Sequence, residues 1–427
     1  MSSKNRSKKI RAARFVATAV VALVVAASGS IANAATAERT TDWTTKTHPV
    51  FMPNIANQWR SPGDDSSPFQ PPAPPCPESG TLPSPFSNCG LPEFPAVGEP
   101  YPGNMAYWGG PVQANPKIYL VYWGWGIKGA FIEPCKSEKI VEGNARATLP
   151  CDPDGAGKLM ADFVYQMGGT KWAGLQSQYY ETVGGKQVNI KNPKNQLGGI
   201  WVDDSSHLDT TKYTPSALVQ QEEGTGDNGS RIFSQIAAEA GRGAAHFHIA
   251  KNDLTDANIV VIQPQKFSDP AAADIGYCAW HDMTNKDVEG GVYNGVQPGI
   301  PFTNMPYALN NGTGCGQGFV NGAKGKLDGY TMILGHEIEE AVTDPGGEQI
   351  LPDGTIMGAW YDPFDANENA DKCAWVDAGP IPGQTQPGAA GNIKGNHGGS
   401  FAVQSLWDNE AANGAGWCSG AGSDFPG

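Results

Sequence analysis

Residues 336–340 are the stretch of the sequence best suited to metal chemistry, because they read His336-Glu337-Ile338-Glu339-Glu340. Residues four apart project from the same face of a helix, so His336 and Glu340 could both bind one ion. Glu337 lies beside them and could accept a proton from a water that the ion activates. The arrangement is that of a His-Glu-x-x-His zinc peptidase with Glu in place of the second His. It predicts a zinc site in which Glu337 is the catalytic base.

A third metal ligand is expected from the acidic segment between Asp362 and Cys373. Glu368 and Asp371 are its carboxylates nearest to Cys373, which would anchor the segment. We expect one of the two to bind the zinc and the other to support a histidine through a hydrogen bond. The many oxygen donors leave calcium as an alternative, although their spacing is not that of an EF-hand. A further alternative is an ordinary acidic surface on both helix and segment, without any ion.

Among the other histidines, His281 has the most informative neighbours, because it follows Cys278 and precedes Asp282. A neighbouring carboxylate could orient the imidazole, so we predict that His281 is a catalytic residue that contacts the substrate or the transition state. His246 and His248 would share a face, and could form another metal pair, if residues 245–250 were a strand. Since no acidic or cysteine partner is close to them in sequence, a polar strand edge is the favoured interpretation.

The helix expected to carry the metal ligands spans residues 328–343. Its apolar side chains recur on one stripe, and Asp344-Pro345-Gly346 ends it. Predicted strands and helices alternate along the rest of the chain, which indicates an α/β or α+β fold with a mixed central sheet flanked by helices. The strands are expected at 117–123 and 258–262, and the further helices at 159–166, 216–223 and 231–240.

The N-terminus has the features of a secretory signal peptide. Six basic residues flank the start of an apolar run at residues 15–27, and Ala32-Asn33-Ala34 offers a small-residue cleavage site. We therefore predict a signal peptide at 1–34 and a secreted, extracellular protein. No later run reaches the ~20 apolar residues of a spanning helix, so no membrane span is expected in the mature chain. Residues 35–100, rich in Pro, Ser and Gly, predict an extended leader or linker, which leaves 101–427 as a single domain.

The eight cysteines favour disulfides in an exported chain, because their number is even and the cell exterior is oxidising. Their spacing is not the paired Cys-x-x-Cys spacing of a structural zinc site. Pairing between sequence neighbours is the simplest hypothesis. The expected pairs are Cys76 with Cys89, Cys135 with Cys151, Cys278 with Cys315, and Cys373 with Cys418.

The formal net charge of the chain is −14. Residues 1–34 hold six basic and no acidic residues, so the mature chain has 23 Lys and Arg against 43 Asp and Glu, or −20. A protein of this charge repels nucleic acid and anionic lipid, so neither is expected as a partner. The excess carboxylates suit cations better, and a solvated acidic surface is the commoner explanation of such a charge.

Six segments that follow one another in a fixed order carry a family resemblance. They are Tyr107 to Gly124, Gly276 to His281, His336 to Pro345, Ala359 to Tyr361, Glu368 to Cys373, and Phe401 to Trp407. Together they resemble the phosphate-induced, EXORDIUM-like family of extracellular proteins, which is known from plants with bacterial and fungal relatives. The resemblance covers about residues 104–418. The chain departs from the family pattern at Trp108, where the family usually has His, and at Asn369 and Lys372, which replace apolar residues.

The resemblance implies an extracellular location and supports a single cluster of His336, Glu337, Glu340, Glu368 and Asp371. A helix pair followed by a separate Glu is also similar to the zinc site of the glu-zincin peptidases. The reaction of the EXORDIUM-like family is generally unassigned, so the resemblance implies no substrate.

The leading hypothesis is a secreted zinc-dependent hydrolase, most simply a metallopeptidase that acts on an extracellular peptide. The first alternative is a non-catalytic extracellular or cell-wall-associated protein, in which zinc or calcium is structural and the surface binds a wall polymer. The second is a polymer-binding module that uses exposed aromatic side chains such as Trp123, Trp125 and Trp360. Roughly two in three of these tryptophans are expected to be buried, which disfavours the second alternative.

Overall fold

We describe the protein from a computed structural model in which the chain divides into two units, residues 1–39 and 40–427. The described residues all belong to the second unit. They are residues 46–47, 50–53, 103–132, 135–213, 230–284, 299–346, 349–350, 356–362, 367–375, 390–414 and 416–420. The predicted signal peptide, the cysteine pair 76 and 89, and the helix expected at 216–223 lie outside them.

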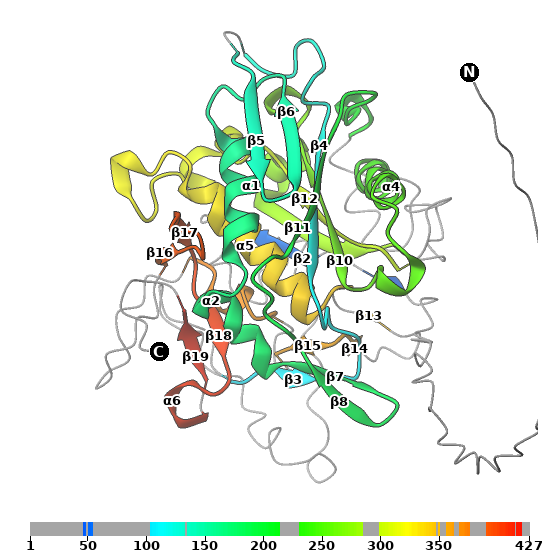
Figure 1. Cartoon of the computed structure of the whole chain (residues 1–427), viewed down its shortest axis with the longest axis vertical. Coiled ribbons are helices and arrows are strands. Elements are labelled where there is room, and N and C mark those ends of the chain that lie inside the picture. The colour runs from blue at the N-terminus through cyan, green and yellow to red at the C-terminus, as the bar shows by residue number, and fades with distance from the viewer. Residues whose placement is uncertain are drawn as a thin grey trace, which may run out of the picture. The chain divides into compact units, whose positions relative to one another are not determined.

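A mixed six-stranded sheet lies at the centre of the second unit (Figure 1). Its strands lie in the order β2 (Val50–Pro53), β11 (Tyr277–Met283), β12 (Pro301–Met305), β10 (Ala257–Ile262), β4 (Lys117–Trp123) and β9 (Leu197–Asp203). From β12 to β9 the neighbours are parallel, whereas β11 is antiparallel to both of its neighbours. The two strands expected from the sequence are β4 and, within one residue, β10. The predicted mixed α/β fold is therefore confirmed.

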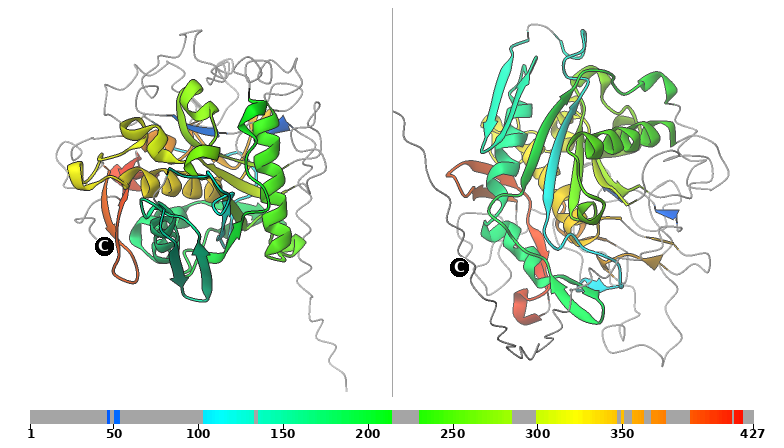
Figure 2. Two further views of the ribbon diagram at one scale, coloured as in Figure 1. Left: turned by 90° about the horizontal axis from the view of Figure 1, so that it is seen from above. Right: turned by 45° about the vertical axis from the view of Figure 1, so that its right-hand side comes forward.

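Alternating side chains of the central strands supply two hydrophobic cores, one on each face of the sheet. In β4, Leu120 packs into one core and Val121 into the other. Helices α1 (Ala156–Met167) and α5 (Asp328–Thr343) cover the first face, and α4 (Ser230–His246) covers the second (Figure 2). Strands buried on both faces have continuous apolar sequences, which is why β4 and β10 were predictable.

Shorter elements complete the unit, and most of them pair with a neighbour in the sequence. A three-stranded sheet consists of β1 (Lys46–Thr47), β13 (Gln349–Ile350) and β14 (Ile356–Met357). The two-stranded sheets are β3 (Ala106–Tyr107) with β15 (Trp360–Tyr361), β5 (Glu138–Glu142) with β6 (Ala145–Leu149), β7 (Tyr180–Val183) with β8 (Lys186–Asn189), β16 (Gly391–Lys394) with β17 (Ser400–Val403), and β18 (Leu406–Asp408) with β19 (Trp417–Ser419). Among the described residues, the other α-helices are α2 (Lys171–Gly174) and α6 (Ala411–Gly414).

Helix α5 has the bounds that the sequence predicted, and it is buried along its whole length. It packs against the central sheet and against β17, where Thr331 Oγ1 donates a hydrogen bond to the Ala402 carbonyl (2.6 Å). All four acidic residues of the helix are buried. The alternative of an ordinary solvent-exposed acidic face on this helix is therefore wrong.

Three disulfides link cysteines that are neighbours in sequence: Cys135–Cys151, Cys278–Cys315 and Cys373–Cys418. The pairing predicted for these six cysteines is confirmed. Two of the crosslinks fasten segments that carry predicted site residues, because Cys278 lies in β11 and Cys373 ends a 3₁₀ turn at Asp371–Cys373.

Two parts of the chain differ from what the sequence indicated. The Pro-rich leader contributes strands to the unit, since β2 pairs with β11 and β1 with β13. Residues 245–250 do not form the strand considered for His246 and His248. His246 ends α4 and stacks on Trp201 with ring centroids 4.2 Å apart, and His248 has a positive φ of 53°. Among the described helices, none combines the length and the apolar character that crossing a membrane requires.

Gly329, in the first turn of α5, lets the helix approach the segment around Cys315. A Cβ at Gly329 would lie 1.9 Å from the Cys315 carbonyl oxygen, so the backbone would have to move. We expect Gly329→Ala to lower the free energy of unfolding by about 1–3 kcal/mol, as overpacking does, measured by denaturant unfolding. Gly314→Ala is the matched control, because a Cβ there meets nothing within 4 Å. Equal stability of the two variants would contradict this account of the packing.

Candidate metal centre

The six predicted site residues come together from three parts of the chain. His336, Glu337 and Glu340 lie on α5, His281 lies on β11, and Glu368 and Asp371 lie in the acidic segment, residues 367–375. Strand alternation directs the His281 ring toward α5, because its neighbour Trp280 packs into the core on the opposite face of the sheet. The convergence of these side chains is consistent with the single cluster that the sequence predicted.

His336 and Glu340 face each other across one turn of α5. His336 Nε2 lies 3.0 Å from Glu340 Oε2 and 3.4 Å from Asp371 Oδ1. The backbone N–H of Asp371 donates a hydrogen bond to Glu340 Oε1 (2.8 Å), which fixes that carboxylate and leaves Oε2 directed at His336. The three ligand atoms lie within 4.8 Å of one another, which is close enough to hold one ion.

Gln404, one residue after β17, fixes the imidazole of His336. Its Nε2 donates a hydrogen bond to the Ala370 carbonyl (2.7 Å), so its Oε1 is the atom that faces His336 Nδ1 at 3.1 Å. This network assigns the proton of a neutral His336 to Nδ1, which donates to Gln404. The Nε2 atom then carries a lone pair directed at Glu340 and Asp371. A histidine that binds a metal is commonly oriented in this way by the hydrogen bond of its other nitrogen.

His281 has different partners, because a backbone carbonyl faces one of its nitrogens and a carboxylate faces the other. Nε2 lies 3.1 Å from the Asp344 carbonyl oxygen, and Nδ1 lies 3.2 Å from Glu337 Oε2. Burial alone lowers the pKa of His281, but the charge of Glu368 and the hydrogen bond with Glu337 outweigh it and raise this pKa well above its usual value. Without a metal ion these surroundings favour an imidazolium ion, as they do for His336, and a bound cation would replace the proton on either ring.

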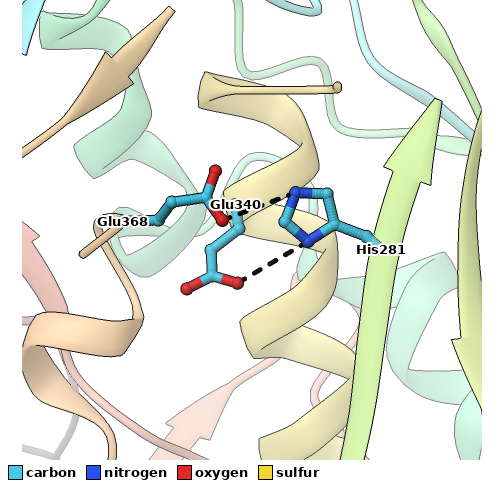
Figure 3. Close-up of side chains that lie close together, drawn as sticks. All are labelled: His281, Glu340 and Glu368. Atoms are coloured by element: carbon cyan, nitrogen blue, oxygen red, sulfur yellow. Dashed lines mark ion pairs between the residues drawn. The ribbon is translucent and has the colours of Figure 1, made fainter. Parts of the chain in front are cut away.

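The cluster contains two groups of side chains that could hold a metal ion, and Glu340 belongs to both. One group is His336, Glu340 and Asp371, and the other is His281, Glu340 and Glu368. Figure 3 shows the second group, in which His281 Nδ1 lies 3.7 Å from Glu340 and Nε2 lies 3.6 Å from Glu368. From the sequence we expected either Glu368 or Asp371 to be the third ligand of one ion. In the structure, each of them belongs to a different group of possible ligands.

The carboxylates of the centre are buried with little compensating positive charge. Burial is the main reason that the pKa of Glu340 rises to about 7 and that of Glu368 to about 8. Burial opposes the charged form of His336 as well, but the Glu340 charge raises the pKa of His336 well above its usual value. The centre therefore favours an added positive charge, which either a proton or a metal ion can supply.

Atoms without hydrogen bonds indicate where this charge would lie. Among the described residues, no hydrogen bond reaches His336 Nε2, Glu340 Oε2, Glu337 Oε1 or either carboxylate oxygen of Glu368. Buried polar atoms normally have partners, and a cation would satisfy these. One imidazole and two carboxylates are a donor set that zinc accepts, and the carboxylate oxygens also suit calcium. The residues present therefore fit a divalent metal ion.

Two contributions to the site were missed by sequence reasoning. The side chain of Gln404 had a signal, since it lies in the family-like segment at 401–407, but nothing local marks it as the partner of His336. The contribution of Asp344 had no sequence signal, because its backbone carbonyl, which any residue could provide, accepts the hydrogen bond from His281.

The acidic segment, residues 367–375, is held in place by an ion pair as well as by the disulfide of Cys373. Lys372 is fully buried and pairs with Asp362, and its ammonium group lies 4.4 Å from the ring centroid of Trp407. A buried lysine needs such a partner. The pair accounts for a lysine at a position where the resemblance implies an apolar residue.

Comparisons with known proteins assign neither a family nor a function to this chain. No family model, no curated protein and no solved structure matches this chain. Membership of the EXORDIUM-like family therefore stays a hypothesis that rests on the six sequence segments. The function has to be argued from the geometry of the site.

The Cys373–Cys418 disulfide is expected to hold a metal ligand as well as the fold. Its sequence separation is 45 residues, for which loop-closure entropy corresponds to about 4 kcal/mol of stability. We expect removal of both cysteines by alanine substitution to lower Tm and to speed metal loss to a chelator, because Asp371 lies two residues from the crosslink. Removing Cys135–Cys151, which brackets the β5–β6 hairpin, is the matched control and should leave metal retention unchanged. Equal rates of metal loss in both variants would show that the Cys373–Cys418 disulfide has no specific role in holding the metal.

Gln404 should control the metal affinity of His336. Gln404→Ala removes the acceptor that keeps the proton on Nδ1, so we expect affinity for zinc to fall by about 10–100-fold, measured by competition with a chromogenic chelator. Gln196→Ala is the matched control, because Gln196 is also buried but bonds to Asn192, a residue outside the cluster (3.2 Å). Unchanged affinity in Gln404→Ala would refute the proposed orientation of the ring.

Proposed function

We propose that this protein is a secreted zinc-dependent hydrolase, most simply a metallopeptidase, whose ion is held by His336, Glu340 and Asp371. The observation that carries the proposal is the position of His336 Nε2, which Gln404 orients and which faces the buried Glu340 carboxylate at 3.0 Å and the partly buried Asp371 carboxylate at 3.4 Å. Catalytic zinc sites commonly use three protein ligands and keep a fourth position for water. The sequence features of a signal peptide and the three disulfides support export to an oxidising environment.

The neighbouring residues supply the acid and base groups that hydrolysis needs. A zinc ion at this position would lower the pKa of a bound water and polarise a carbonyl group. Glu337 is placed to accept the proton of the attacking water, because its buried Oε1 has no hydrogen bond among the described residues. Burial raises the pKa of Glu337, which suits a base that works near neutral pH. His281, 3.2 Å from Glu337 Oε2, can donate a proton to the leaving amine.

The second candidate function is a non-catalytic protein with a structural zinc or calcium ion. The observation that favours it is burial, because the side chains of His336, Glu340 and Glu368 have no exposed surface. The polymer-binding alternative loses its support, since Trp123, Trp125 and Trp360 are all buried rather than exposed.

Metal content tests the ligand set. We expect purified wild-type protein to contain stoichiometric zinc by mass spectrometry, and His336→Ala, Glu340→Ala and Asp371→Ala to lose it, because each removes a ligand. Glu368→Ala should keep its zinc, since Glu368 belongs to the other group of possible ligands. Loss in Glu368→Ala with retention in Asp371→Ala would move the ion to the other group. Calcium alone, or no metal in a folded wild type, would refute the hydrolase.

Turnover by Glu337→Gln separates an enzyme from a structural metal protein. We expect this variant to keep its fold and zinc, and to hydrolyse a peptide library about 10²–10⁴-fold more slowly, because the general base is lost. Glu339→Gln is the matched control, because Glu339 is buried on the same helix but lies near Gln176 and belongs to neither group of possible ligands. If the wild type cleaves no peptide, or if the two variants have equal turnover, a structural metal ion explains the site better than a catalytic one.

A further inference from the structure

A short strand from the N-terminal leader completes the sheet beside the candidate metal centre. β2 pairs antiparallel with β11, and this pairing places Val50 opposite His281 and Phe51 opposite Trp280. β2 is the terminal strand in the order of the sheet, so β11 would be the edge without it. The next described element along the chain, β3, begins at Ala106. A distant part of the sequence thus covers the edge strand that carries His281.

The same part of the leader also contacts α5, the helix that carries other site residues. β1 pairs antiparallel with β13, whose first residue, Gln349, comes shortly after the end of α5. β2 itself contacts both α5 and β11. β2 therefore lies against the two elements from which His281 and His336 project.

Backbone pairing along a sheet edge is a general way to bind an extended polypeptide. The hydrogen bonds come from the main chain, so many sequences can be accepted, while pockets for alternate side chains add selectivity. A chain paired with β11 passes directly beside His281, as the register of Val50 shows. The edge of β11 is thus suited to present a peptide bond to the cluster.

The cluster is closed to a large substrate in the full chain. The side chains of His281, His336, Glu340 and Glu368 have no exposed surface, and that of Asp371 is 11% exposed. A polypeptide substrate can reach these groups only if some covering part of the chain moves. Among the described elements, the leader strand β2 contacts both β11 and α5 and is far from both in sequence.

We propose that the edge of β11 is a binding site for an extended polypeptide, and that Val50–Pro53 occupies this edge in the full chain as an internal competitor. Release of the strand frees the edge and opens a path to His281. Binding of the polypeptide requires the sheet edge alone. Cleavage of the bound polypeptide would in addition require the proposed hydrolase function.

Phe51→Pro in the full chain tests the proposal, because proline has no backbone N–H and disrupts strand pairing. The probe is a fluorescein-labelled octapeptide with the sequence of residues 46–53. We expect the variant to bind this probe saturably in fluorescence anisotropy, at least about ten-fold more tightly than the wild type, whose edge is occupied. Gln187→Pro, in β8 of the β7–β8 hairpin, is the matched control and should bind the probe as the wild type does.

A peptidase assay on the same proteins separates this proposal from the proposed function. Probe binding by Phe51→Pro without any hydrolysis supports the edge site and refutes the hydrolase. Equal probe binding by Phe51→Pro and the wild type overturns the edge site, and leaves the hydrolase standing if both proteins cleave peptides. Faster hydrolysis and tighter binding in Phe51→Pro together support both.

Hydrogen exchange shows whether Phe51→Pro is folded. In a folded variant we expect faster exchange of β11 amides and unchanged protection of α4. If protection is lost everywhere, the test uses wild-type protein cut by a protease between residues 54 and 102. Excess probe should then displace the cut leader fragment from the remainder in gel filtration, and a fragment that stays bound at saturating probe overturns the proposal.

Discussion

The burial of several carboxylates around α5, with little positive charge to balance them, is the constraint on which the rest of this structure depends. A carboxylate removed from water is costly unless hydrogen bonds and opposite charges replace the water. The raised pKa values of Glu340 and Glu368 express that cost. Two imidazoles, a backbone N–H and Gln404 offset part of it, and the remaining atoms without partners define the place of a cation.

Identical side chains have different chemical capacities in this cluster because their hydrogen-bond partners differ. His336 has one nitrogen bonded to an amide oxygen and one facing carboxylates, which suits a ligand. His281 faces a backbone carbonyl at one nitrogen and Glu337 at the other, which suits a proton donor to the catalytic base. The same logic separates Glu339 from Glu337, since one contacts Gln176 and the other contacts His281. Residue type limits the possible roles, and the surrounding contacts select among them.

The frame around the cluster is built from connections between distant parts of the chain. The Cys278–Cys315 disulfide lies three residues from His281, and the Cys373–Cys418 disulfide lies two residues from Asp371. Each crosslink fixes a segment that has little regular structure on one of its sides. Such anchoring helps to position the site residues, because ligands of one ion must be held within about half an ångström of their places. A rigid and closed cluster is also what makes a movable cover, such as the leader strand, relevant to function.

The sequence alone determined the features that depend on local periodicity or on neighbouring residues. These were the apolar strand β4, the bounds of α5, the common face of His336 and Glu340, and the pairing of six cysteines. Only the tertiary structure decided which nitrogen of each histidine is available, that Glu368 and Asp371 belong to different groups, and that the leader supplies an edge strand. Those outcomes depend on contacts between residues far apart in the chain, which spacing along the sequence does not encode.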